Sequence, residues 1–172
     1  MTSGEREAIS NEEGEILVRG PIVMAGYFGQ PDATSRAIVD GWLHTGDAGR
    51  LDVDGFLFVL DRRDDLIVTG GENVYPAEVE AVLSAHPAVI EAAVIGVDDP
   101  RWGQRVVAIV RLDYKSDMTD EDASDLQTFC RASLAGYKVP KDIRFVNEPL
   151  PRTASGKLRR ATLRDSGPTL SS

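Results

Sequence analysis

The spacing of apolar residues alternates between two periods beyond residue 65. Short, nearly continuous apolar runs are typical of buried strands. They predict strands at residues 66–68, 73–74, 89–97, 106–112 and 143–146. Apolar residues at helical spacing, each time after a residue that suits a helix start, predict helices over residues 76–85 and 119–134. Because the helices alternate with the strands, we expect a compact α/β sandwich.

The first third of the chain has a different pattern, rich in short strand signals. The predicted elements are strands at residues 14–19, 42–44 and 56–60 and a short helix between residues 31 and 40. The charged run 61–65 follows, and its solvated side chains leave the backbone free to rotate, so we predict a hinge there. The expected fold class is α+β, with a small β-rich lobe at residues 1–62 and the α/β sandwich at residues 63–172.

Composition and charge argue against several classes of function. The formal net charge is −9, whereas a nucleic-acid partner requires clustered Lys and Arg, so none is expected. Cys130 is the single cysteine, and no Cys/His cluster has the spacing of metal ligands. Neither a signal pattern nor a bilayer-length apolar run occurs, so we expect a soluble cytoplasmic protein. His44 and His86 are expected to be structural, since neither has an acid at dyad spacing in the sequence.

Three spaced motifs carry the candidate chemistry. They are residues 41–47 (GWLHTGD), 61–76 (DRRDDLIVTGGENVYP) and 151–160 (PRTASGKLRR). In this order the motifs resemble the acyl-adenylate-forming superfamily of acyl-CoA synthetases, aryl-CoA ligases, luciferases and nonribosomal peptide adenylation domains. That family also carries a phosphate loop and an acyl pocket upstream, and neither is found here. The resemblance therefore implies a C-terminal portion: a β-rich remnant of the N-terminal domain, then the mobile C-terminal domain.

Lys157 is the candidate catalytic residue. It follows Gly156 and precedes a predicted short helix, so a mobile ammonium lies at the end of a loop. Such a cation stabilises charge that develops when a carboxylate attacks the α-phosphate of ATP, and the resemblance implies this role. The alternative is an ordinary solvated lysine beside Arg159 and Arg160.

Asp47, Arg62 and Asp64 are the candidates at the nucleotide and the hinge. Asp47 is expected just after a strand, and the resemblance implies that its carboxylate accepts hydrogen bonds from the ribose hydroxyls. Arg62 matches an arginine that reaches the ribose or phosphate, and Asp64 matches the residue about which the C-terminal domain rotates between two half-reactions. The alternatives are a turn aspartate for Asp47 and plain surface charges for the other two.

Five further residues are candidates for binding CoA. Gly70 and Gly71 permit close approach of the backbone to a pantetheine arm, although most Gly-Gly pairs are simple hairpin turns. The resemblance implies that Trp102, Tyr137 and Lys138 contact the CoA nucleotide. For Trp102, stacking on adenine and partial burial in the core remain equally open. A second basic CoA contact of some relatives falls on Val139, a departure from the family pattern.

The resemblance implies a parent enzyme that converts a fatty or aryl carboxylate, ATP and CoA into acyl-CoA, AMP and pyrophosphate through an acyl-adenylate, with Mg²⁺ accompanying the ATP. Residues 101–104 and 126–131 are closest to aryl-CoA ligases. Without the phosphate loop the chain is expected to be inactive alone.

Two other hypotheses remain. One is a non-catalytic truncated module that binds nucleotide weakly, forms a homodimer through residues 1–60, or complements a separate N-terminal domain. Self-association is expected because severed strands expose apolar edges. The other is an adenylation domain that feeds a carrier protein, although the chain has no carrier-type serine motif.

Overall fold

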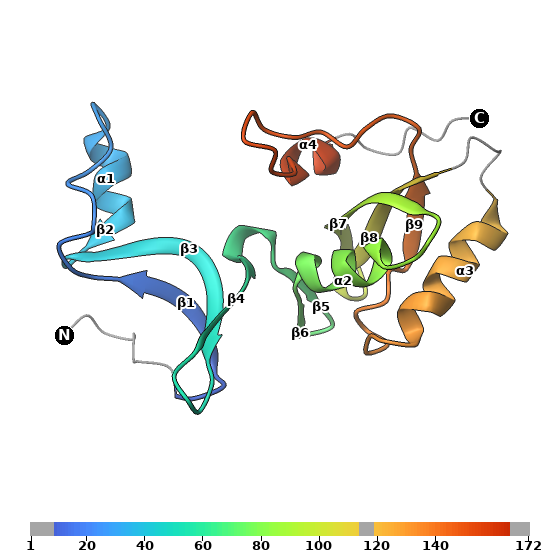
Figure 1. Ribbon diagram of the computed structural model, residues 1–172, viewed down its shortest axis with the longest axis horizontal. Coiled ribbons are helices and arrows are strands. Elements are labelled where there is room, and N and C mark those ends of the chain that lie inside the picture. The colour runs from blue at the N-terminus through green and yellow to red at the C-terminus, as the bar shows by residue number, and fades with distance from the viewer. Residues whose placement is uncertain (1–8, 114–118, 166–172) are drawn as a thin grey trace. The chain divides into compact units, whose positions relative to one another are not determined.

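The protein is described by a computed structural model that covers residues 9–113 and 119–165. It divides into two compact units, Met1–Asp64 (unit 1) and Asp65–Ser172 (unit 2). Both units combine helices with a sheet, so the expected α+β class is confirmed (Figure 1). Among the described residues, no helix has the length and apolar character needed to span a membrane.

Unit 1 is built on an antiparallel sheet around one long strand. In its described part the elements are β1 (Glu13–Val18), α1 (Pro31–Ala37), β2 (Ile38–Val39), β3 (Trp42–Leu51) and β4 (Leu57–Arg62). Strand β3 pairs with β1, β2 and β4. The prediction that this strand ends near residue 44 is wrong, because pairing with β1 and β4 carries it through the positive-φ Gly46 to Leu51. Asp47 therefore lies inside β3.

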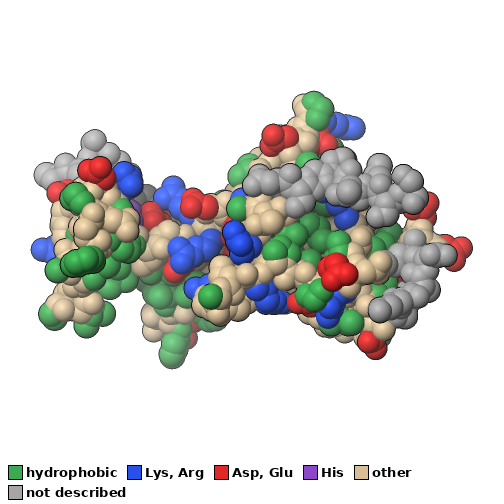
Figure 2. Space-filling view, turned by 90° about the horizontal axis from the view of Figure 1, so that it is seen from above, with side chains coloured by type: hydrophobic (Ala, Val, Ile, Leu, Met, Phe, Trp, Pro, Cys, Tyr) green, Lys and Arg blue, Asp and Glu red, His purple; other side chains and the backbone are tan. Residues whose placement is uncertain are grey.

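Unit 1 buries little apolar surface of its own. Within residues 9–64, Ala48 is the one hydrophobic side chain that is buried. Large apolar side chains lie open on its surface (Figure 2). They include Ile22, Tyr27, Phe28, Val53, Phe56, Leu57, Phe58 and Val59. A sheet with this much exposed apolar surface is typical of a face that a further segment or partner covers.

Unit 2 contains a second sheet with helices on both faces. Its described elements are β5 (Ile67–Thr69), β6 (Glu72–Val74), α2 (Pro76–Ser84), β7 (Val89–Asp99), β8 (Gly103–Leu112), α3 (Asp120–Arg131), β9 (Asp142–Phe145) and α4 (Arg160–Asp165). The sheet order is β6-β5-β8-β7, with β9 parallel to β8 and the other pairs antiparallel. The 3-10 turn η1 (Arg63–Asp65) precedes β5.

The sheet of unit 2 is buried on both faces, which explains the continuous apolar runs. Alternate residues of β8 point to opposite sides, since Val106 and Ala108 join one core cluster while Val107 and Ile109 join another. The first cluster includes residues of α2 and α3, and the second includes Leu163 of α4. The expected layered sandwich is thus present, with Leu150, Leu158 and α4 on the second face.

The ends of the helices follow the predicted signals closely. Pro76 occupies the first turn of α2. Thr119 caps α3, where its hydroxyl accepts from the backbone N–H of Asp122, and the Asp122 carboxylate accepts from the N–H of Thr119. Helix α3 ends at Arg131 rather than at residue 134, because the chain turns there to bury Leu134.

Candidate functional site

Asp47 and Arg62, the candidate nucleotide residues, form an ion pair across two strands of unit 1. They face each other in the β3–β4 register, and Arg62 Nε lies 2.9 Å from Asp47 Oδ1. Both remain accessible, with 36% of the Asp47 side chain and 56% of the Arg62 side chain exposed. A carboxylate accepts hydrogen bonds from hydroxyls and a guanidinium donates to phosphates, so the pair offers both kinds of contact at one edge.

Glu15 of β1 holds the backbone beside Asp47, a role that sequence reasoning missed. Its Oε1 accepts from the N–H of Gly46 at 3.1 Å, and its Oε2 lies 3.2 Å from His44 Nδ1 and 3.0 Å from Arg63 Nη1. Burial raises the pKa of Glu15, but the hydrogen bonds from His44 and Gly46 and the charges of His44 and Arg63 lower it by more. Sequence spacing did not reveal this partner of His44, because Glu15 lies 29 residues earlier in the chain.

His86 also has an acidic partner. Its Nε2 lies 3.3 Å from Asp125 Oδ2 of α3, and its ring meets Phe129 edge-on at a centroid distance of 4.9 Å. This partner is again distant in sequence, so the spacing of acidic residues did not reveal it. Both contacts of the ring are with side chains of α3, which fits a structural role.

Replacing Glu15 with Gln is expected to reduce the loss of unfolding free energy that occurs at acid pH. Because the pKa of Glu15 in the folded protein lies below its ordinary value of 4.5, the stabilisation is present above that value and is lost as pH falls through the folded pKa. Urea unfolding followed by Trp42 fluorescence in a Trp102→Phe background, from about pH 7 to about pH 3, should show a smaller acid loss in the variant. Equal acid losses in the two proteins would contradict this assignment.

Gly70 and Trp102 are in direct contact in unit 2. Gly70 and Gly71 form the β5–β6 turn with φ of 61° and 86°, and the N–H of Gly70 donates to the carbonyl of Trp102 at 2.8 Å. A Cβ on Gly70 would lie 3.0 Å from Cε3 of the Trp102 ring, whereas one on Gly71 would meet nothing within 4 Å. The Trp102 side chain is 45% exposed, with the Arg101 guanidinium 4.8 Å from the ring centroid. Trp102 is thus about half exposed and belongs to neither core cluster of unit 2.

Gly70→Ala is expected to displace the Trp102 ring, and Gly71→Ala is its matched control. Both substitutions place a side chain on a residue with positive φ, and this backbone strain lowers the unfolding free energy by about 1 kcal/mol in each case. Only the first also meets an indole, so we expect it to lower the unfolding free energy by about 1 kcal/mol more. Trp102 fluorescence in a Trp42→Phe background should change with Gly70→Ala alone, and equal spectra in the two variants would contradict the contact.

Tyr137 and Lys138 lie on the segment between α3 and β9. Lys138 Nζ contacts both carboxylate oxygens of Glu78 in α2, at 2.8 and 2.7 Å, and lies 5.8 Å from the Tyr137 ring centroid. Tyr137 is 38% exposed. Val139, by contrast, is buried in the core at 3% exposure, which is why a basic residue is not accommodated there.

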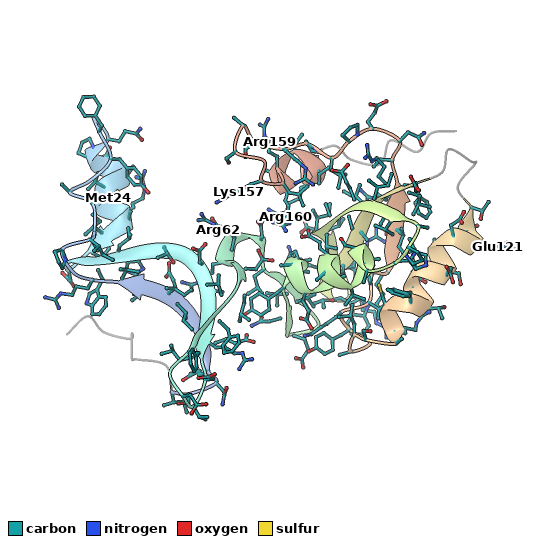
Figure 3. The ribbon with its side chains drawn as sticks, in the orientation of Figure 1. Met24, Arg62, Glu121, Lys157, Arg159 and Arg160 are labelled. Carbon is teal, nitrogen blue, oxygen red and sulfur yellow. The ribbon has the colours of Figure 1, made fainter. Side chains whose placement is uncertain are left out.

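Lys157 extends from the tip of a closed loop (Figure 3). An isolated bridge joins Arg152 to Leu158, and the N–H of Thr153 donates to the carbonyl of Lys157 at 2.8 Å. Thr153 Oγ1 accepts from the Lys157 N–H at 3.2 Å. The backbone is thus fixed while the side chain is exposed. The predicted short helix after Lys157 is α4.

Asp64 is exposed and is the last residue of unit 1. Its neighbour Asp65, the first residue of unit 2, binds Arg160 and Arg164 of α4 at 3.1 and 2.8 Å. Among the described side chains, no group of His, Cys, Asp and Glu has the arrangement of a metal site.

The comparisons with known proteins define the class. Residues 78–157 match the family model of the AMP-binding enzyme C-terminal domain. Residues 78–157 therefore form an AMP-binding enzyme C-terminal domain, and the chain is similar to the C-terminal part of adenylate-forming enzymes.

The similar proteins include CoA ligases. The chain is 57% identical over 153 residues to the 2-succinylbenzoate–CoA ligase of Geobacillus sp. (strain WCH70), covering 89% of this chain and 30% of that protein. It therefore spans about a third of the length of such relatives. Among solved structures it is similar to o-succinylbenzoate CoA synthetase (MenE) of Bacillus subtilis in complex with the acyl-adenylate OSB-AMP, with a TM-score of 0.84, 47% identity and coverage of 94% of this chain and 33% of that one. ATP-bound MatB of Rhodopseudomonas palustris has a TM-score of 0.82 and 36% identity, covering 95% and 32% of the two chains.

Proposed function

We propose that this chain supplies the C-terminal part of the active site of an ATP-dependent acid–CoA ligase. The parent reaction joins a carboxylate to AMP with release of pyrophosphate, and CoA then displaces AMP to give the acyl-CoA. The observation that carries this proposal is the match over 89% of the chain to a 2-succinylbenzoate–CoA ligase at 57% identity.

Adenylation uses Asp47, Arg62 and Lys157 in this proposal. The Asp47 carboxylate accepts from the ribose hydroxyls, and Arg62, paired with it at 2.9 Å, donates to ribose or phosphate. The exposed ammonium of Lys157 neutralises negative charge as the carboxylate oxygen attacks the α-phosphorus and the bond to pyrophosphate breaks. Mg²⁺ accompanies the ATP, as it does in a structure of the Bacillus subtilis relative in complex with ATP and magnesium ion.

Thioester formation uses the other group of candidate residues. Asp64 is the pivot between units, and rotation there exchanges the Lys157 loop for the Gly70–Gly71 turn at the acyl-adenylate. The exposed ring of Trp102 lies against Gly70 and stacks on the adenine of CoA, while Tyr137 and Lys138 contact the same nucleotide. The thiolate of CoA then attacks the acyl carbon, and AMP leaves with the bonding electron pair.

The carboxylate in this proposal is an aryl acid of the 2-succinylbenzoate kind, because the relatives act on that class by name. The test is acid-dependent pyrophosphate release by the chain alone and after addition of the separately produced N-terminal portion of the Geobacillus relative. We expect no release from the chain alone, release with 2-succinylbenzoate after complementation, and little with a fatty acid. Activity of the chain alone would overturn the half-site proposal.

A second candidate is a non-catalytic module that dimerises or binds a separate domain through residues 1–60. The exposed apolar side chains within residues 9–60 favour it, although residues 1–8 of this segment lie outside the described residues. Sedimentation velocity distinguishes the two candidates. A dimer that persists after addition of the complementing domain supports the module, whereas a one-to-one complex supports the ligase.

A further inference from the structure

The Lys157 loop is held from both ends by arginines that bind carboxylates on other elements of unit 2. Arg152 enters the loop and Arg160 begins the helix that leaves it. Within residues 152–159, only Leu158 packs against a core cluster. With so little apolar packing, the loop depends on hydrogen bonds and ion pairs for its geometry.

The first anchor runs from β7 to the peptide before Lys157. Glu91 Oε1 accepts from Arg152 Nη2 at 3.1 Å, and Arg152 Nη1 donates to the carbonyl of Gly156 at 2.9 Å. Glu91 is 15% exposed, and its Oε2 also accepts from the N–H of Leu150 at 3.2 Å. Arg152 therefore connects a nearly buried carboxylate to the residue adjacent to the catalytic candidate.

The second anchor joins α4 to α2 and to the first residue of unit 2. Arg160 Nη2 lies 2.7 Å from Glu80 Oε2, and Arg160 Nη1 lies 3.1 Å from Asp65 Oδ2. The three side chains are only 13%, 14% and 19% exposed. Glu80 Oε1 also accepts from the N–H of Val94 in β7 at 2.8 Å, which fixes the carboxylate to the sheet.

We propose that Glu91 and Glu80 are positioning residues for Lys157. They act through Arg152 and Arg160, which clamp the loop on either side of the lysine. A long, flexible side chain delivers charge accurately only when its backbone is fixed, and charge-assisted hydrogen bonds from nearly buried carboxylates are directional enough to fix it. The inference rests on the proposed role of Lys157 in adenylation, but its structural half is measurable without any activity.

Hydrogen exchange in the 172-residue chain tests the clamp directly. Arg152→Met removes the guanidinium that links Glu91 to the loop. The Arg152 side chain is 45% exposed, and Glu91 keeps the hydrogen bond from the N–H of Leu150. We expect the amides of Gly156 and Lys157 to exchange about tenfold faster, with β7 and β8 unchanged. Glu91→Gln should act in the same direction. Asp142→Asn is the matched control, since it removes the negative charge of the exposed Arg105–Asp142 pair, which joins β8 to β9 and includes no residue of the loop.

The proposal is overturned if exchange in residues 151–159 stays at the level of the control, or if it rises equally throughout unit 2. The effect on activity is measured in the enzyme reconstituted from this chain and the separate N-terminal portion. Arg152→Met should lower kcat for adenylation about tenfold with the KM for ATP unchanged, and leave thioester formation from added acyl-adenylate intact. If Lys157→Ala itself leaves adenylation intact, the proposed function fails; if Lys157→Ala is inactive and Arg152→Met is fully active, only the positioning inference fails.

Discussion

Lys157→Ala is expected to slow acyl-adenylate formation by about a hundredfold to a thousandfold in the complemented enzyme, the usual effect of removing one group aimed at developing charge. The fixed backbone of the loop and the exposed side chain make this a loss of transition-state stabilisation rather than a loss of fold. Thioester formation from added acyl-adenylate should keep its rate, because we propose that this step uses the Gly70–Gly71 turn in place of Lys157. Pyrophosphate release and acyl-CoA formation, measured separately, check the two halves.

Arg159→Ala is the matched control for that experiment. Arg159 is an exposed cation two residues further along the chain, and its backbone N–H donates to the carbonyl of Pro151 at 2.9 Å, a bond that alanine keeps. We expect the control to retain the rate of adenylation. Equal losses in the two variants would show that the general positive charge of the segment matters and that Lys157 has no special role.

Arg160→Met is expected to lower the unfolding free energy of unit 2 by about 3 kcal/mol. Removing one partner of a buried ion pair leaves an uncompensated charge, and here Glu80 keeps one backbone hydrogen bond, from Val94, in a nearly buried position. Urea unfolding at neutral pH, followed by Trp102 fluorescence in a Trp42→Phe background, gives the measurement.

Arg164→Met is the control on the same helix. Arg164 is 35% exposed and pairs with Asp65, which retains Arg160, so its loss should cost about 1 kcal/mol or less. A loss for Arg160→Met as small as that of the control would mean that the cluster around Glu80 is solvated and does not anchor α4.

The elements of unit 2 were largely predictable because their signals are local. Helix α2 starts at the expected Pro76, and α3 has the expected capping box at Thr119. The β5–β6 hairpin forms across the expected Gly70–Gly71 turn. Strand β3 was underestimated, because its continuation past Gly46 depends on two neighbouring strands that local periodicity does not reveal.

The candidate site shows the same division between features set by local sequence and features set by contacts between distant residues. The sequence by itself determined which residue types stand at the three motifs, including Lys157 behind a glycine and Asp47 and Arg62 as candidates for one nucleotide. Only the tertiary structure decided that Asp47 and Arg62 are cross-strand partners, that Trp102 is exposed against Gly70, and that Glu15, Glu80 and Glu91 support these segments. The physical reason is that a carboxylate has the same appearance in sequence whether it is solvated or paired. Its partner, 29 to 80 residues away, is chosen by the packing of strands and helices.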